Sequence, residues 1–133
     1  MNYFSYIFPL TVYKVSSVYN RDIRVVEESG RYKLLVNGAR ESGEYIKKLW
    51  EYAIKKLEIS KKRNVKRILV LGVAGGTIIH LLHAMYPKAK ITGVDIDSVM
   101  IEIGKKYFGL RDMKNVTLIV ADAKDFILHR KNN

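Results

Sequence analysis

Three glycines and the helix expected after them have the types and spacing to do chemistry. Gly72, Gly75 and Gly76 follow the apolar run at residues 68–71, and a glycine-rich bend lets backbone approach a ligand with no Cβ in the way. A helix starting near Thr77 points its unpaired N–H groups at that bend. Strand, bend and helix in this order are typical of a nucleoside-binding Rossmann-type unit.

Two aspartates end the next two expected strands. Asp95 comes 23 residues after Gly72, close to the spacing of about 20 residues at which an acid accepts hydrogen bonds from both ribose hydroxyls. Asp122 ends the third strand at the same edge of the sheet, where its carboxylate can accept a hydrogen bond from the exocyclic amine of adenine. The predicted ligand-binding set is Gly72, Ala74, Gly75, Gly76, Asp95, Ile96, Asp122 and Ala123.

The glycines and the two aspartates also have a purely structural interpretation. The glycines would suit tight packing between strand and helix, Asp95 a helix cap or solvated acid, and Asp122 a turn. Trp50 is interpreted as a core anchor rather than a surface for ligand binding. The three histidines are scattered along the chain, so we predict no metal site, and the sequence identifies no catalytic residue.

The glycine pattern argues against two common classes of nucleotide ligand. A dinucleotide fingerprint would place glycine at positions 72, 74 and 77, but this chain has Ala74 and Thr77. A P-loop needs Gly-Lys-Ser or Gly-Lys-Thr after the bend, and neither is present. A bend without a phosphate cradle, followed by acids on two strand ends, fits a nucleoside that lacks a pyrophosphate. S-adenosylmethionine or its decarboxylated form is the natural candidate.

Hydrophobic periodicity predicts the elements that position these residues. Residues 11–19, 23–28 and 32–36 are rich in β-branched and aromatic side chains and are separated by turn residues, which predicts antiparallel strands. Residues 1–40 therefore form a small N-terminal β-hairpin segment, packed on the main domain or reaching away from it. Residues 41–133 are expected to form a truncated Rossmann-like nucleoside-binding domain.

This second part alternates helices and strands. The apolar run 68–71 reads as a strand buried on both faces, as parallel strands under helices are, and Asp97 or Ser98 is expected to cap a helix. Short connections imply right-handed crossovers and a parallel sheet in the order 3-2-1. The fold class is thus α/β. The helices are predicted at 43–59, 77–86 and 98–108, and the strands at 68–71, 90–95 and 116–121.

Composition restricts the class of protein. The chain has 133 residues, no cysteine and a net charge of +11, which excludes disulfides and thiolate sites and makes nucleic acid a possible but not favoured partner. No apolar run is long enough to span a bilayer, and the start lacks the basic region and cleavage site of a secretory signal. A cytoplasmic location without membrane contact is therefore the default expectation.

The ordered motifs at residues 68–76, 94–97 and 120–123 resemble those of class I S-adenosylmethionine-dependent methyltransferases. Within that superfamily the chain is most similar to the spermidine synthase group of aminopropyltransferases, which also carry a β extension before the Rossmann-like part, as residues 17–38 do here. This resemblance implies binding of S-adenosylmethionine or decarboxylated S-adenosylmethionine, for aminopropyl or methyl transfer in polyamine biosynthesis or on another acceptor. A catalytically inactive scaffold or nucleic-acid-binding relative is the alternative.

The chain departs from the spermidine synthase pattern at several positions. Those enzymes carry an aspartate in the glycine-rich bend, where this chain has Gly75. Their glutamines of the hairpin region fall near Asn20 and Glu41, and their Tyr-His pair falls near residues 46–48. Their catalytic aspartate follows a fourth strand that this sequence lacks. The resemblance therefore leaves the acceptor, and catalysis itself, open.

A half-sheet has a physical consequence. The first strand of a 3-2-1 arrangement is normally central, and without a fourth strand it exposes unpaired N–H and C=O groups beside apolar side chains. We therefore expect the chain either to be part of a longer protein or to complete its sheet with another chain as a homo-oligomer.

Overall fold

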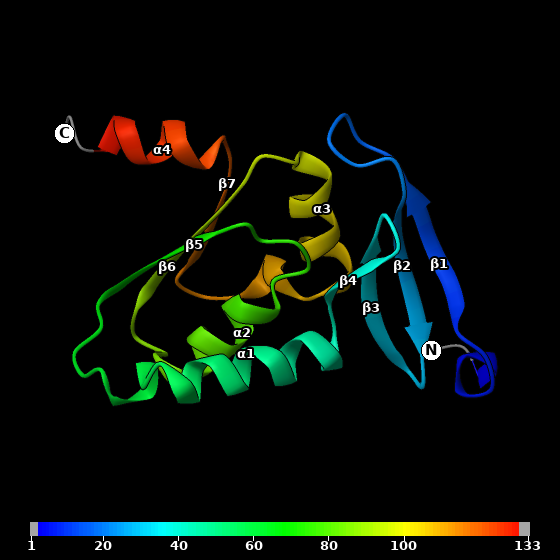
Figure 1. Cartoon of the computed structure of the whole chain (residues 1–133), viewed down its shortest axis with the longest axis horizontal. Helices are drawn as coiled ribbons and strands as arrows, with labels where there is room; N and C mark the ends of the chain where they lie inside the picture. Colours follow the sequence, from blue (N-terminus) through cyan, green and yellow to red (C-terminus); the bar gives the residue numbers. More distant parts are fainter. Residues whose placement is uncertain (1–2, 131–133) are drawn as a thin grey trace.

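The computed structural model describes residues 3–130, in which two sheets and their helices lie along one long axis (Figure 1). The first sheet contains β1 (Leu10–Val15), β2 (Ile23–Glu28), β3 (Arg31–Val36) and β4 (Ala39–Ser42). The second contains β5 (Arg67–Leu71), β6 (Lys90–Asp95) and β7 (Val116–Val120). The helices are α1 (Glu44–Lys56), α2 (Thr77–Met85), α3 (Ser98–Tyr107) and α4 (Ala123–Arg130), with short 3-10 turns η1 (Tyr3–Tyr6), η2 (Ile59–Lys61) and η3 (Leu110–Asp112).

The N-terminal sheet is an antiparallel meander in the order β1-β2-β3-β4. Its tight turns, Ser29-Gly30 and Asn37-Gly38, have both central residues at positive φ, the backbone that matches the twist of a two-residue hairpin. The hairpin prediction is confirmed, although β1 ends at Val15 and not at residue 19. The sequence did not predict β4, because Ala-Arg-Glu-Ser has little strand propensity.

This sheet packs on the main domain rather than reaching away from it. One face of β2 and β3 is apolar and meets one face of α3, so that a continuous hydrophobic cluster joins the two parts of the chain. Burying such side chains stabilises by roughly 1.5–3 kcal/mol each, which fixes the position of the hairpins relative to the parallel strands. The buried members are Ile23, Val25, Leu34, Val36, Met100 and Ile103.

The parallel sheet has the order β5-β6-β7, as predicted. Both α2 and α3 pack on one face of it, because Ile79 and Ile101 join Val70 and Ile91 in a single core cluster. On the other face of β5, Leu69 and Leu71 are 43% and 45% exposed. The expectation that residues 68–71 are buried on both faces was therefore wrong, since right-handed crossovers place both helices on the same side.

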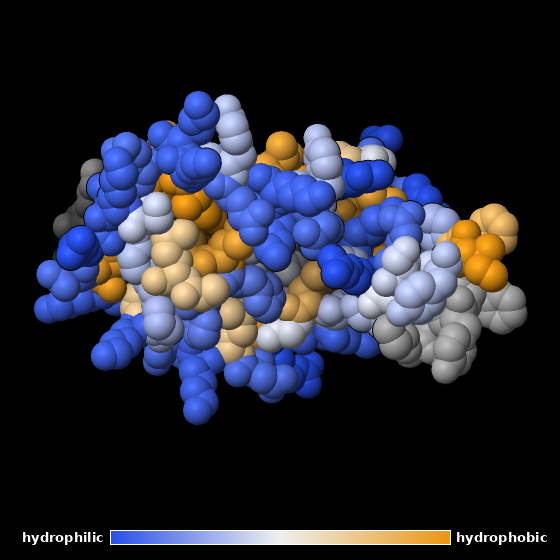
Figure 2. Space-filling view, turned by 90° about the horizontal axis from the view of Figure 1, so that it is seen from below, coloured by the Kyte–Doolittle hydropathy of each residue, from blue (hydrophilic) through white to orange (hydrophobic). Residues whose placement is uncertain are grey.

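Among residues 3–130, β5 pairs with β6 alone, so its other edge carries no strand. The expectation that the first parallel strand has an unpaired edge is confirmed. That a longer protein or a second chain completes the sheet stays a prediction. No helix within this described range is long and apolar enough to cross a bilayer. Seen from the side that carries α1, the surface is mainly hydrophilic with separate hydrophobic areas, one of them at the end formed by the N-terminal sheet (Figure 2).

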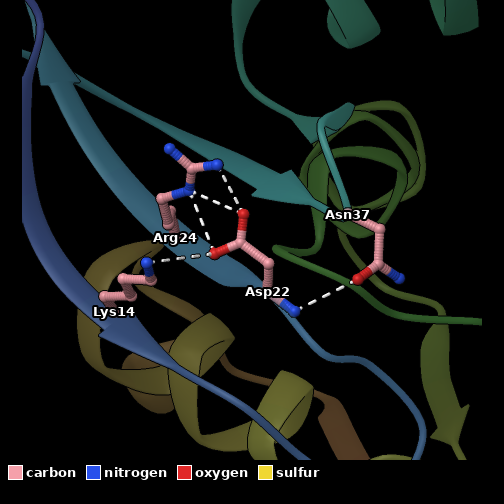
Figure 3. A network of polar contacts seen from close by, with 4 residues as sticks. All are labelled: Lys14, Asp22, Arg24 and Asn37. Carbon is pink, nitrogen blue, oxygen red and sulfur yellow. Dashed lines mark hydrogen bonds and ion pairs between the residues drawn. The ribbon is translucent and has the colours of Figure 1, made fainter.

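A polar network holds the start of β2 to its neighbours (Figure 3). Arg24 Nε donates to Asp22 Oδ1 and Oδ2 at 3.1 and 2.9 Å, and Lys14 Nζ lies 3.9 Å from Asp22 Oδ1. Asp22 N donates to Asn37 Oδ1, and Asn37 N donates back to Asp22 O. The hydrogen bond from Arg24 lowers the pKa of Asp22 below its usual value, and the charges of Arg24 and Lys14 act in the same direction against desolvation.

We expect Asp22→Asn to remove a small, pH-dependent part of the stability. A carboxylate with a lowered folded pKa stabilises the fold above its unfolded pKa of about 3.9, and that stabilisation is lost as the pH falls through the folded pKa. The melting temperatures of wild type and variant should therefore differ at pH 6 and converge near pH 2. Because the ion pair is solvent-accessible, added salt should shrink the difference. A difference that is constant over this pH range would contradict the assignment.

Candidate functional site

A cavity of about 630 Å³ opens where the carboxyl ends of β5 and β6 meet α1 and the N-terminal sheet. Its volume lies within the range of about 300–1,000 Å³ that is usual for small-molecule sites. Every layer of the fold contributes to its wall, including residues as distant in sequence as position 20 and position 100. The lining residues are Asn20, Val36, Glu41, Ile46, Leu49, Trp50, Ala53, Gly72, Val73, Ala74, Thr77, Ile78, Asp95 and Met100.

The structure brings together three of the predicted ligand-binding residues, Gly72, Ala74 and Asp95, on one wall of this cavity. Gly72 has φ +82°, and a Cβ built on it would meet nothing within 4 Å. Ala74 adopts φ +47°, a left-handed conformation that costs a non-glycine residue about 1–2 kcal/mol. The bend therefore takes a strained path beside an open space, as expected for backbone that approaches a ligand.

Gly75 and Gly76 lie beneath the bend instead of facing the cavity. A Cβ on Gly75 would lie 2.7 Å from both Cβ and Oγ of Ser42, and one on Gly76 would lie 2.5 Å from the Leu110 side chain. Gly75 N also donates to Ser42 Oγ at 2.8 Å. Close packing, the structural interpretation of the glycines, thus accounts for these two positions: Ser42 of β4 packs against Gly75, and Leu110 of η3 packs against Gly76.

Three predicted residues lie at the carboxyl ends of β6 and β7 but do not line the cavity. Ile96 is 41% exposed. Asp122 is exposed and caps α4, since its Oδ1 accepts hydrogen bonds from Lys124 N and Asp125 N at 2.8 and 3.1 Å. Ala123 is the first residue of that helix. Their contact with an adenine stays a prediction.

The Asp95 carboxylate accepts hydrogen bonds from the backbone of the glycine-rich bend. Its Oδ2 accepts from Val73 N at 2.8 Å and from Ala74 N at 3.2 Å, and its Oδ1 accepts from Asp97 N at 2.9 Å. The side chain is half-buried and lines the cavity. The carboxylate thus faces both the backbone of the bend and the space in which a ligand would lie.

Asp97 holds the β1–β2 loop against the site. It caps α3 through Val99 N, as one of the two predicted caps, and it is only 2% exposed. Its Oδ2 also accepts from Ser17 Oγ at 2.5 Å and from Asn20 Nδ2 at 3.0 Å. These two bonds place Asn20 on the cavity wall, across 77 positions of sequence.

Trp50 is not the core anchor that its helical spacing predicts. It is 42% exposed and lines the cavity, together with Leu49, which is 50% exposed. Periodicity shows correctly that these residues share one face of α1, but α1 packs against α2 and β4 and also covers a hollow. Trp50 is therefore available to contact a ligand.

The charge of the cavity is opposite to that of the whole protein. The chain carries a net charge of +11, yet the ionisable residues among the lining are the carboxylates Glu41 and Asp95. Within residues 3–130, no hydrogen bond or ion pair engages the Glu41 carboxylate. Two anions beside an aromatic ring favour a ligand that carries positive charge. In the sequence, Glu41 and Asn20 stand out only as departures from a glutamine pattern.

Part of the chain is similar in sequence to known methyltransferases and to an aminopropyltransferase. The family described as a methyltransferase domain matches residues 68–132. The eEF1A lysine and N-terminal methyltransferase homolog of Drosophila melanogaster is 39% identical over 72 residues, which are 53% of this chain and 11% of that protein. The polyamine aminopropyltransferase of Vibrio vulnificus is 32% identical over 62 residues, which are 47% of this chain and 21% of that protein.

The solved structure of spermidine synthase from Thermotoga maritima extends the similarity to the N-terminal sheet. It matches with a TM-score of 0.69 and 17% sequence identity, and the match covers 88% of this chain and 42% of that one. The chain thus spans less than half the length of these relatives. The two sheets and their order, together with this match, show that the chain has a spermidine synthase-like fold, and the methyltransferase-domain model matches its Rossmann-like part.

Proposed function

We propose that the cavity binds S-adenosylmethionine or decarboxylated S-adenosylmethionine as the donor for group transfer to an amine. The observation that carries the proposal is the acidic cavity beside the strained bend, in a chain of net charge +11. Both donors are cations, and a bound donor supplies an electrophilic carbon next to its sulfonium. The superfamily fold supports the adenosyl part, and the cavity volume suits a ligand of this size.

The residues of this chain would divide the binding between them. The backbone of Gly72 and Ala74 approaches the nucleoside, and Asp95 accepts a hydrogen bond from its ribose. Glu41 offers a carboxylate to an ammonium group, while Trp50 covers apolar atoms and excludes water. Asp122 and Ile96, at the neighbouring strand ends, are proposed to contact the adenine. No residue of the chain is assigned as the base that deprotonates the acceptor.

Methyl transfer is our first candidate reaction, and the name of a relative supports it. A relative that is 39% identical over 72 residues is named a methyltransferase. Aminopropyl transfer is the second candidate, since Glu41 retains an anion in the cavity and the decarboxylated donor carries the larger positive charge.

Calorimetric titration with both donors tests the proposal. We expect both to bind, and Glu41→Gln to weaken the decarboxylated donor by about three- to tenfold, more than intact S-adenosylmethionine, because one exposed charge pair contributes about 1 kcal/mol and the decarboxylated donor has a net charge of +2 rather than +1. Glu51→Gln is the matched control, because Glu51 lies on α1 beside Lys47 and outside the cavity lining. It should bind both donors as the wild type does.

Salt dependence separates the proposal from the nucleic-acid alternative. Nucleic-acid affinity falls by about 10³–10⁵ between 50 and 200 mM salt for a protein with several phosphate contacts, whereas nucleoside affinity should change little. Absence of heat with either donor, in protein that melts cooperatively, would refute the proposed function. Tight, salt-sensitive binding of nucleic acid without donor binding would support the inactive relative instead.

A further inference from the structure

A cluster of cations lies at the amino ends of the three parallel strands, the end of the sheet opposite the donor cavity. The loops that lead into these strands are residues 57–66, 86–89 and 113–115. Figure 1 shows the first of these loops at the end of the molecule far from the N-terminal sheet. The loops and the first residues of β5 and β6 carry eight exposed basic side chains, which we call the basic pole: Lys61, Lys62, Arg63, Lys66, Arg67, Lys88, Lys90 and Lys114.

Hydrogen bonds between the three loops hold the basic pole together. The Tyr86 hydroxyl donates to the carbonyl oxygen of Ile59 at 2.5 Å, which joins the second loop to the first. Asn115 Nδ2 donates to the carbonyl oxygen of Pro87 at 3.5 Å, which joins the third loop to the second. The cations of all three loops therefore form one surface, although the sequence separates them by up to 53 positions, from residue 61 to residue 114.

A groove of about 630 Å³ opens between the strand starts of the basic pole. Arg67 and Lys90 are direct partners in the register of β5 and β6, and both line the groove. Thr92, Asn115 and Thr117 line it as well, and hydroxyl and amide side chains donate hydrogen bonds to phosphate oxygens as basic side chains do. Among the described residues of this lining none is aromatic, so the groove offers no surface on which a base can stack.

The positive charge of the basic pole is largely uncompensated. The acids in or directly beside its loops are Glu58 and Asp112, and Glu58 Oε1 pairs with Lys61 Nζ at 2.5 Å. Within residues 3–130, the other seven cations of the pole form no ion pair. Near the N-terminal sheet, by contrast, Arg31 pairs with Glu44 at 3.0 Å. Like charges gathered at one end of a chain attract a partner with many negative charges.

We propose that the basic pole binds the phosphate backbone of a nucleic acid without reading its sequence. Neutralising phosphates with these cations releases the counterions condensed on the nucleic acid, which drives binding. A groove admits a ridge of phosphates, whereas the flat surface of a bilayer does not enter it, so nucleic acid fits this site better than an anionic membrane. The five residues of β5 separate the groove from the donor cavity by about 16 Å, at about 3.3 Å per residue. Both sites can be occupied at once, and this inference does not depend on the proposed function.

Fluorescence anisotropy with an end-labelled DNA duplex of about 20 base pairs tests the proposal. Near physiological salt we expect a dissociation constant of about 10⁻⁴–10⁻⁶ M, and a plot of log affinity against log salt with a slope of about −4 to −6, for about five or six phosphate contacts. A duplex of unrelated sequence should bind within about threefold of the first, because contacts to phosphates carry no sequence information.

Two double variants of equal charge assign the binding to the basic pole. Arg67→Gln combined with Lys90→Gln removes the paired cations of the groove. Lys48→Gln combined with Lys124→Gln is the matched control, because both lysines are exposed and lie on α1 and α4, outside the pole. The first variant should lose about 5- to 30-fold in affinity, and its salt slope should become about 2 less negative. The control should bind within about twofold of the wild type.

The outcomes that would overturn the inference are distinct from those that test donor binding. Equal losses in the two variants would show a diffuse effect of net charge, and a duplex that does not bind the folded protein would refute the site directly. Binding to vesicles of phosphatidylserine and phosphatidylcholine, without binding to the duplex, would assign the basic pole to a membrane surface instead. The groove variant should bind S-adenosylmethionine as the wild type does. If the donor binds neither protein, the proposed function fails and this inference stands on the duplex titrations alone.

Discussion

Gly76→Ala is expected to destabilise the protein by about 3 kcal/mol, because two penalties add at this position. The residue has φ +80°, where alanine pays about 1–2 kcal/mol. A Cβ there would also lie 2.5, 2.6 and 2.9 Å from Cδ1, Cδ2 and Cγ of Leu110. Leu110 is 3% exposed and cannot move without disturbing its neighbours, so overpacking adds about 1–3 kcal/mol.

Gly38→Ala is the matched control for this substitution. Gly38 has φ +85°, but a Cβ there would meet nothing within 4 Å, so the variant should pay only the backbone penalty of about 1–2 kcal/mol. Urea denaturation of the two variants and the wild type measures the difference. Equal losses in the two variants would show that the contact with Leu110 is not rigid.

Asp97→Ala is expected to lower both stability and ligand affinity. The substitution removes the cap of α3, which contributes about 1 kcal/mol, and it leaves the donors of Ser17 and Asn20 without their acceptor at about 1–3 kcal/mol for a donor that stays buried. The expected destabilisation is about 3 kcal/mol. Because the β1–β2 loop loses its tether, Asn20 should leave the cavity wall and the affinity for S-adenosylmethionine should fall at least about tenfold, the equivalent of 1.4 kcal/mol.

Asp122→Ala provides the comparison for the loss of a helix cap. Asp122 caps α4 in an exposed position, so its substitution should cost about 1 kcal/mol, the usual contribution of a cap. Thermal melting of both variants and calorimetric titration of Asp97→Ala separate the two effects. If Asp97→Ala melts like Asp122→Ala and binds donor normally, the tether between the loop and α3 has no role in the site.

Sequence patterns predicted the strands, turns and bends that are formed by consecutive residues. The apolar run before Gly72, the bend and the acid at Asp95 follow from strand periodicity, glycine spacing and strand length, and the structure places them together on the cavity wall. The hairpin turns at Ser29-Gly30 and Asn37-Gly38 are equally local.

The parts that the sequence did not predict depend on contacts between distant segments. Helical spacing shows that Trp50 lies on the apolar face of α1, but not whether that face meets a sheet or a hollow. The role of Ser42 beneath Gly75 depends on a four-residue strand with weak propensity. The bond between Asn20 and Asp97 joins positions 77 residues apart, which no periodicity within either segment can predict.

Within residues 3–130, one edge of β5 has no partner strand, and this has a consequence for the protein in concentrated solution. Backbone N–H and C=O groups on that edge can pair with an added strand from any extended segment. The exposed hydrophobic side chains of Leu69 and Leu71 lie beside them. Mutual repulsion between copies of net charge +11 opposes such encounters. Since dissolved ions weaken this repulsion, the colloidal stability of the chain depends on ionic strength until a partner strand occupies the edge.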